Sequence, residues 1–350
     1  MSGRSGFGGR LARFDPPSRV GALVGAVLLV AAGTFLLAPE LVGYPLVAAV
    51  LVVGYGLFAD QATTVRALAL AATVVTVLVL GLITVYLVVQ SLPAFRTMGP
   101  GIVLKRAPFW NPDSGLFSLV PMIWGTVVTT LIATLVAAPL GVAGAVFIAE
   151  MAPDWARGLL KPAVEGLAGV PSIVYGFIGL TLLSPFMSTN FGLPTLGSLL
   201  VVGAVIGAMA LPTVVSVAED AIDSVPGAMK DGSLALGATD WQTTTDVTLP
   251  AAFSGVSAAI LLGVGRAVGE TMAATVILAN VTTLPDPLYD VFGNTITLTS
   301  LIASQYGIAS GTQMSALFAA GVILFVTVLG LSLGSQYVER RMERSFGGTP

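Results

Sequence analysis

Long apolar runs separated by short polar segments dominate the chain from position 20 onward. About 20 apolar residues at 1.5 Å per residue cross a hydrocarbon layer of roughly 30 Å as a helix. Strands of a membrane barrel would instead alternate apolar and polar residues over about ten positions. The pattern predicts an all-α integral membrane protein with about eight transmembrane helices. The predicted spans are 20–38, 41–59, 67–89, 120–150, 163–186, 195–218, 251–280 and 314–334.

Charge near the first span orients the predicted bundle. Residues 1–19 are glycine-rich and carry four arginines against one aspartate. Basic residues beside a span favour the cytoplasmic side, so we expect this segment to be a cytoplasmic tail. An even number of spans then places the C-terminal tail, 339–350, on the same side. Residues 295–307 are too short to span, and we expect them to form a helix lying on or dipping into the outer face.

Composition excludes most catalytic chemistry. The 350 residues are 55% hydrophobic and 9% charged, and they include neither cysteine nor histidine. Disulfides, thiol nucleophiles, Ser-His-Asp triads and the usual zinc sites are therefore ruled out, and we expect neither a cofactor nor a metal. The only lysines are Lys105, Lys161 and Lys230, and none ends the phosphate-binding loop of an ATPase. If ATP drives this protein, another chain must bind it.

Two full charges interrupt the apolar run 251–280. Each intramembrane charge costs about 2.5 to 3.5 kcal/mol on insertion scales, which makes Arg266 and Glu270 candidate site residues. In a continuous helix from Pro250, Arg266 would lie about 24 Å along the axis, near the bilayer midplane, with Glu270 on the same face. The pair could simply neutralise itself. Alternatively, Arg266 offers fixed donors to an anion, and Glu270 accepts a hydrogen bond from an oxyanion that still carries a proton.

The run 163–186 contains the sequence GVPSIVYGFIG, in which Pro171 removes a backbone hydrogen bond. Either a packing kink or a broken helix lining a translocation path follows from such a proline. Ser172 and Tyr175 beside it could donate to an anion's oxygens or to a carbonyl of a neighbouring helix. The sequence leaves both interpretations open.

A polar stretch precedes the charged run. Residues 228–246 place four apolar side chains among polar ones, which predicts a short amphipathic helix and turn at the cytoplasmic surface. The stretch resembles the EAA loop of ABC importer permeases, which docks on a separate ATPase subunit. The residues that carry this resemblance are Asp231, Gly232, Ser233, Gly237, Val247, Leu249 and Pro250.

Further blocks extend the resemblance over roughly residues 90–340. They resemble the PstC-type permease subunits of phosphate ABC importers, within the binding-protein-dependent transport permease family. The motif GETMA at 269–273, rather than GETAP, favours the PstC type over the partner PstA type. The blocks are GTVVTTLIATLVAAPLG (125–141), FIAEMAP (147–153), VEGLAGVPSIVYGFIGL (164–180), LALGATDWQTTTDVTLPAAFSG (234–255) and GRAVGETMAATVILAN (265–280).

This resemblance implies a MetI-like core of six helices that forms half of a pathway for inorganic phosphate, with Thr271 joining the substrate pathway. A PstA-like permease would form the other half, a PstB-like ATPase dimer would sit beneath, and a PstS-like phosphate-binding protein would deliver the substrate outside. The permease would not itself be an enzyme, and no nucleic acid is implied. The EAA triplet departs from the family pattern, because Gly232 weakens a helix by about 1 kcal/mol relative to alanine.

The implied location is the plasma membrane of a prokaryote, surrounded by membrane lipid, with both termini cytoplasmic. An importer for sulfate or molybdate is the alternative within this class. An ion-coupled secondary transporter with Arg266 and Glu270 as a relay is the alternative from another class, and it leaves the polar loop without a purpose. The predicted segments are a tail (1–19), an accessory transmembrane hairpin (20–66), the first core helix and external loop (67–118), the permease domain (119–338) with its coupling loop (219–249), and a tail (339–350).

Overall fold

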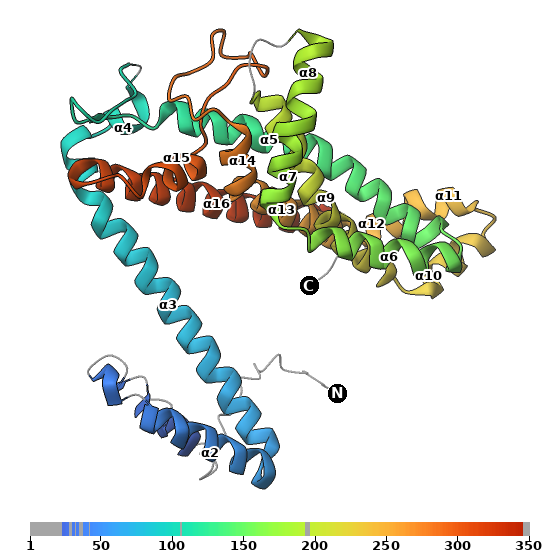
Figure 1. Cartoon of the computed structure of the whole chain (residues 1–350). Coiled ribbons are helices and arrows are strands. Elements are labelled where there is room, and N and C mark those ends of the chain that lie inside the picture. Colours follow the sequence, from blue (N-terminus) through green and yellow to red (C-terminus); the bar gives the residue numbers. More distant parts are fainter. Residues whose placement is uncertain are drawn as a thin grey trace, which may run out of the picture. The chain divides into compact units, whose positions relative to one another are not determined.

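The computed structural model describes residues 23–345 apart from 28, 29, 32, 35–37, 42, 106 and 193–196 (Figure 1). The regular structure in these residues is helical except for one antiparallel hairpin, in which β1 (Trp110–Asn111) pairs with β2 (Leu116–Phe117) after the short helix α4 (Gly101–Leu104). The chain divides into two compact units, Met1–Tyr86 and Leu87–Pro350. The predicted all-α membrane fold is confirmed.

The first unit contains the short helix η1 (Pro39–Leu41), helix α2 (Gly43–Ala59) and the beginning of α3 (Gln61–Met98). The carboxylate of Asp60 accepts a hydrogen bond from the Thr63 amide at 3.2 Å, which satisfies a free donor at the start of α3. Most apolar side chains of α3 are exposed, as expected of a helix surrounded by lipid, whereas Ala94 near its end is buried. α2 has 17 residues, which is short for a span. Much of the predicted span 20–38 lies outside the described residues.

Helices α5 (Val120–Val146) and α9 (Leu199–Asp223) form the centre of the second unit. α5 continues into the π-helical turn η2 (Phe147–Met151). Glycines on α9 let the two helices approach closely, since a Cβ on Gly203 would lie 2.5 Å from the Cβ of Ile132. Small residues at such a contact let backbones pack in a membrane, where lipid is as apolar as the side chains.

A proline divides the predicted span 163–186, and the prediction of its extent is wrong. α6 (Asp154–Ala168) ends before Pro171, whose φ of −57° and ψ of 135° are not helical. α7 (Ser172–Ile178) begins there and continues through η3 (Gly179–Leu183) into α8 (Ser184–Phe191). The membrane-length segment is therefore Ser172–Phe191, with 20 residues, and Pro171 marks a break rather than a packing kink.

The predicted continuous span 251–280 is also wrong. The helical segment Asp240–Ala251 meets α13 (Phe253–Val268) at a bend of 73°. α13 then stops, and a break at residues 269–271 separates it from α14 (Met272–Ile277). We call these three residues the α13–α14 break. The preceding short helices are α10 (Gly227–Ala235), α11 (Asp240–Thr243), the π-helical turn η4 (Thr244–Thr248) and α12 (Leu249–Ala251).

Helix α15 (Leu298–Gln305) is the short helix expected within residues 295–307, and its first half is buried. Leu298 is 1% exposed and Leu301 is fully buried. They pack in one apolar cluster with Met122 of α5 and Leu317 of α16 (Gly311–Ser345). Of the two predicted placements, this burial fits a helix that dips into the bundle rather than one that lies on its surface, and the side of the membrane stays a prediction.

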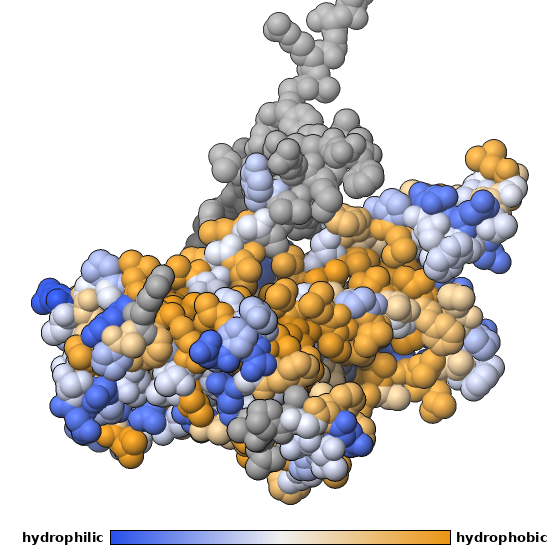
Figure 2. Space-filling model, turned by 90° about the horizontal axis from the view of Figure 1, so that it is seen from above, coloured by the Kyte–Doolittle hydropathy of each residue, from blue (hydrophilic) through white to orange (hydrophobic). Residues whose placement is uncertain are grey.

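Five helices in the described residues are long and apolar enough to cross a membrane, or six if the bent segment that ends in α13 is one span. The count of eight spans therefore stays a prediction. Figure 2 shows broad apolar areas on the visible face, with polar residues gathered mainly toward its two ends and a smaller polar group between the apolar areas. This distribution is typical of a bundle embedded in a bilayer.

Candidate functional site

The two charges that interrupt the apolar sequence lie at the end of α13 and in the α13–α14 break. Arg266 is exposed in the last turn of α13, where the negative end of the helix dipole stabilises a cation. Glu270 is half-buried, and its Oε1 accepts a hydrogen bond from the Ala273 amide at 3.0 Å. The Thr299 hydroxyl of α15 donates to the backbone carbonyl of Glu270 at 2.7 Å. The break is therefore held at both its carboxylate and its backbone.

Arg266 and Glu270 do not form the predicted ion pair. In the described part of the chain, no carboxylate oxygen lies within 4.0 Å of the Arg266 guanidinium. The prediction required both residues on one face of a continuous helix, but α13 ends at Val268. The two side chains therefore do not neutralise each other in this structure.

A pocket of about 560 Å³ lies between α13 and α16 beside Arg266. Leu261 and Leu262 line it from α13, and Val328 and Leu331 line it from α16. Arg266 adds a positive charge to this largely apolar wall. An exposed guanidinium beside apolar surface attracts an anion more strongly than one surrounded by bulk water, because the local dielectric is lower.

The break at Pro171 and the α13–α14 break are neighbours through helices α7 and α14. A Cβ on Gly176 of α7 would lie 2.9 Å from the Cα of Ala273 in α14, so only glycine fits there. Ser172 is half-buried at the first position of α7. The Tyr175 hydroxyl donates to the carbonyl oxygen of Leu167 in α6 at 3.2 Å. Of the two readings open for Tyr175, the bond to a neighbouring helix carbonyl is the one observed.

Thr271 belongs to the α13–α14 break itself. Its hydroxyl donates to the Gly269 carbonyl at 3.2 Å, and its own carbonyl accepts from the Thr275 hydroxyl at 2.7 Å. The first bond gives the Gly269 carbonyl a donor where the helix is interrupted, whereas the Thr271 carbonyl also accepts from the Thr275 amide at 2.9 Å. The candidate pathway residues therefore come from α13, the α13–α14 break and α7, rather than from one helix face.

The polar stretch 228–246 forms the predicted short helix and turn. α10 ends near Gly237, whose φ of +91° is the left-handed conformation that favours glycine. Thr239 begins α11 with a capping box, in which its hydroxyl accepts from the Gln242 amide and the Gln242 side chain accepts from the Thr239 amide. The Thr243 hydroxyl donates to that of Ser233 at 3.0 Å and ties α11 to α10.

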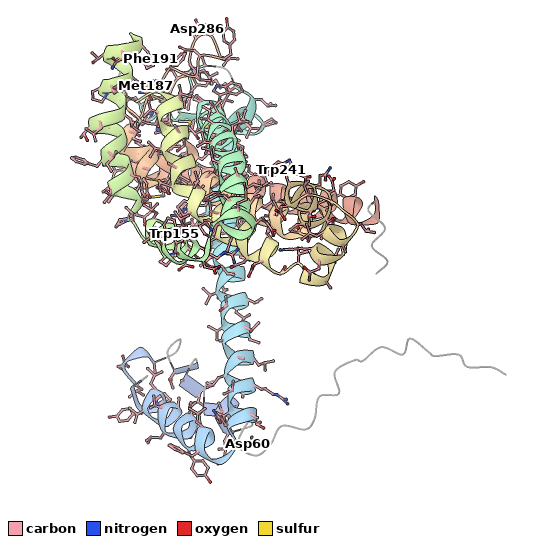
Figure 3. All side chains as sticks on the ribbon, turned by 90° about the vertical axis from the view of Figure 1, so that its right-hand side faces the viewer. Asp60, Trp155, Met187, Phe191, Trp241 and Asp286 are labelled. Carbon is pink, nitrogen blue, oxygen red and sulfur yellow. The ribbon has the colours of Figure 1, made fainter. Side chains whose placement is uncertain are left out.

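Several residues of this stretch are exposed at one end of the second unit. Leu236 is 92% exposed and Trp241 is 61% exposed. In Figure 1, α6, α10 and α11 gather at this end, and Figure 3 looks onto it, with Trp155 and Trp241 labelled. Asp231, Gly232 and Pro250 are exposed, whereas Ser233, Val247 and Leu249 are half-buried. An exposed apolar patch with a polar rim is typical of a protein contact.

Ion pairs that no sequence motif indicates lie at this same end. Lys161 donates to Glu219 at 2.7 Å and to Asp220 at 3.1 Å, and Lys230 donates to Glu150 at 2.6 Å. The hydrogen bonds to Glu219 and then to Asp220 raise the pKa of the Lys161 ammonium above its usual value. These partners lie 58 to 80 positions apart, so no local pattern could have indicated them.

Comparisons with known proteins agree with this architecture. The sequence profile described as "Binding-protein-dependent transport system inner membrane component" matches residues 141–344. A Bacillus subtilis protein named "Probable ABC transporter permease protein YqgH" is 38% identical over 264 residues, which cover 74% of this chain and 84% of that protein. A Mesorhizobium japonicum protein named "Phosphate transport system permease protein PstC" is 33% identical over 297 residues, 79% of this chain and 89% of that one.

Solved structures show the same fold at lower identity. A chain of a bacterial alginate ABC transporter superposes with a TM-score of 0.55 at 16% identity, covering 79% of this chain and 96% of that one. A chain of the MetNI methionine ABC transporter gives 0.51 at 19% identity, covering 64% and 95%. Both curated relatives are named as permease proteins. Matched by the profile over more than half its length, the chain belongs to the family of binding-protein-dependent transport system inner membrane components and is a multi-pass membrane permease.

Proposed function

We propose that this chain is the permease subunit of an ATP-driven importer of inorganic phosphate. The observation that carries the proposal is its similarity, over 79% of its length, to a protein named as the phosphate permease PstC. Family membership favours a permease over an ion-coupled secondary transporter. An importer for sulfate or molybdate is the remaining alternative, and competition between substrates separates it from the proposal.

The proposed assembly assigns a role to each part of the chain. Residues 119–338 form half of the translocation pathway, and a PstA-like permease forms the other half. The exposed end formed by α10 and α11 contacts a PstB-like ATPase dimer. ATP binding is assigned to that dimer, because this chain has no phosphate-binding loop. A PstS-like protein delivers phosphate from outside. Both termini are then cytoplasmic, and residues 20–66 form an accessory hairpin.

In the proposed pathway, Arg266 supplies the attraction for phosphate. Its guanidinium is exposed, lacks a carboxylate partner within the described residues and lines the pocket beside α16. Glu270 supplies discrimination, because phosphate near neutral pH still carries a proton that it can donate to a carboxylate oxygen. Sulfate has no such proton. Thr271 and Ser172 add hydroxyl groups near the two helix breaks, and Tyr175 fixes α7 against α6 through its bond to Leu167.

The test is ATP-dependent uptake of labelled phosphate into vesicles that contain this chain with its three partner subunits. We expect Arg266→Gln to lower uptake at least about tenfold with the complex still assembled, since a hydrogen bond to a charged group contributes about 1.5 to 3 kcal/mol. Glu270→Gln should impair uptake more mildly and let sulfate compete. Gly81→Ala is the control, because a Cβ there meets nothing within 4 Å.

Two results would contradict the proposal. Uptake of sulfate or molybdate by the parent complex, with phosphate as a poor competitor, would assign the chain to another oxyanion. Uptake at the parent rate by assembled complexes of both variants would make Arg266 and Glu270 structural residues only.

A further inference from the structure

The exposed end formed by α10 and α11 has few means of attachment to the rest of the chain. α10 has nine residues and none of them is buried, so apolar packing does not hold it in place. An isolated helix of this length is marginal in water. α10 follows α9 after a short connection and is succeeded by the turn at Gly237. Its position therefore depends on its polar side chains.

One of these side chains reaches the end of a membrane span. Lys230 of α10 donates to Oε1 of Glu150 at 2.6 Å across 80 positions of sequence. The two side chains are 23% and 13% exposed, respectively. A partly buried pair at this distance is screened by salt much less than a pair on open surface. Glu150 lies in η2, the last turn of the segment that begins as α5.

The segment that receives this contact is itself braced. The Arg157 guanidinium of α6 donates to the Ile148 carbonyl at 2.9 Å and also to the Ala149 carbonyl. These carbonyls lie where the helix ends, and a cation there satisfies acceptors that would otherwise lack partners. The position of Glu150 is therefore set by α6 as well as by α5.

α6 connects this brace to the candidate pathway. Lys161 holds α6 on the end of α9 through Glu219, whose side chain is 3% exposed. Near the C-terminal end of α6, the Leu167 carbonyl accepts a hydrogen bond from the Tyr175 hydroxyl of α7. α7 itself begins immediately after Pro171. A continuous set of polar contacts thus runs from α10 through η2 and α6 to α7.

We propose that Glu150 and Lys230 are positioning residues that couple α10 to the membrane spans. Their ion pair fixes α10 on the end of the α5–η2 span, so a displacement of α10 moves that span and α6 instead of being absorbed by the flanking turns. The inference rests on the proposed function, in which α10 contacts the ATPase. Neither residue touches phosphate, and both act through the elements that they join.

The test uses the complete four-subunit complex in liposomes and measures phosphate imported per ATP hydrolysed. Lys230→Gln and Glu150→Gln should each lower this ratio about tenfold, within the 5- to 150-fold range typical of coupling between sites. ATP hydrolysis should continue and the complex should stay assembled. The exchanged pair, Lys230→Glu with Glu150→Lys, should recover most of the parent ratio. Asp223→Asn is the matched control, because it removes an exposed 3.8 Å contact to Arg157 at the same end without touching α10.

The outcomes separate this inference from the proposed function. A parent complex that hydrolyses ATP but imports no phosphate contradicts the proposed function. A parent complex that imports phosphate, with both single variants at its ratio, overturns the positioning role. The positioning role is also overturned if the exchanged pair does not restore the ratio but a doubly neutral Lys230→Gln, Glu150→Gln variant restores it fully. The low ratio of the single variants would then come from the unpaired charge that each of them leaves. If a single variant fails to assemble, the ratio of the doubly neutral variant is compared with that of the parent instead. A low ratio supports the positioning role, and the parent ratio overturns it.

Discussion

Replacing Lys161 by methionine removes the cation that pairs with the buried carboxylate of Glu219. This variant tests whether the ion pair holds α6 in place. Lys161 Nζ lies 2.7 Å from Oε2 of Glu219, and the Glu219 side chain is 3% exposed. Methionine keeps most of the aliphatic stem while removing the ammonium. Glu219 would then be left as a carboxylate in the protein interior without its cation.

The expected cost follows from these exposures. Removing one partner of a fully buried pair destabilises a protein by about 3 to 5 kcal/mol. Lys161 is 39% exposed, and its contact with Asp220 is largely solvated, so water reduces the loss. We expect about 2 to 3 kcal/mol for Lys161→Met. Adding Glu219→Gln should return about 1 to 2 kcal/mol of that loss, because the unpaired charge is removed while an amide remains.

Reversible unfolding in mixed detergent micelles, followed by tryptophan fluorescence, measures both free energies. Trp155 in the first turn of α6 reports on the helix that the ion pair holds. If the double variant is no more stable than Lys161→Met alone, the unpaired Glu219 charge is not the cause of the loss. Equal stability of the parent and Lys161→Met would refute the assigned role of the pair.

Further predictions concern pH and three glycines. The pKa of Lys161 is raised in the folded protein, so its contribution to the free energy of unfolding is complete below the unfolded pKa of about 10.4 and is lost as pH rises through the folded pKa. The difference in free energy of unfolding between the parent and Lys161→Met should therefore stay constant from about pH 7 to 9. Gly232→Ala should stabilise α10 by about 1 kcal/mol, seen as slower amide exchange in α10. Gly237→Ala should have the opposite effect, about 1 to 2 kcal/mol, because its φ is +91°; parent-like exchange would contradict the strain. Gly125→Ala should lower the free energy of unfolding of the second unit by about 1 to 3 kcal/mol in the same assay, because its Cβ would lie 2.5 Å from the Ile296 carbonyl oxygen. An unchanged free energy of unfolding would mean that the backbone at Ile296 moves aside without cost.

The amino-acid sequence by itself determined the class of the protein and the location of its unusual residues. Apolar runs of about 20 residues specify membrane helices because no other open-chain structure satisfies the backbone in hydrocarbon. The absence of cysteine and histidine removed most catalytic chemistry. The motifs around Gly237 and Glu270 were sufficient to indicate the family, and Gly237 adopts the left-handed turn that its residue type favours.

Only the tertiary structure decided how these elements are interrupted and joined. α13 ends between Arg266 and Glu270, although the sequence around these two charges is otherwise apolar and compatible with a helix. The break is held by Thr299, 29 positions away, whose hydroxyl bonds the Glu270 carbonyl. The periodicity of apolar residues indicates whether a segment can form a helix by itself. It contains no information on a donor from a distant segment that replaces a hydrogen bond of that helix.

The ion pairs of α6 and α10 illustrate the same limit. A charged side chain such as Lys161 or Lys230 looks like a solvated surface residue in the sequence, yet each lies within 2.7 Å of a carboxylate from another helix. Coulombic attraction depends on separation and local dielectric, and both are set when the helices pack. The sequence therefore determined which residues carry charge, and the fold determined which charges meet.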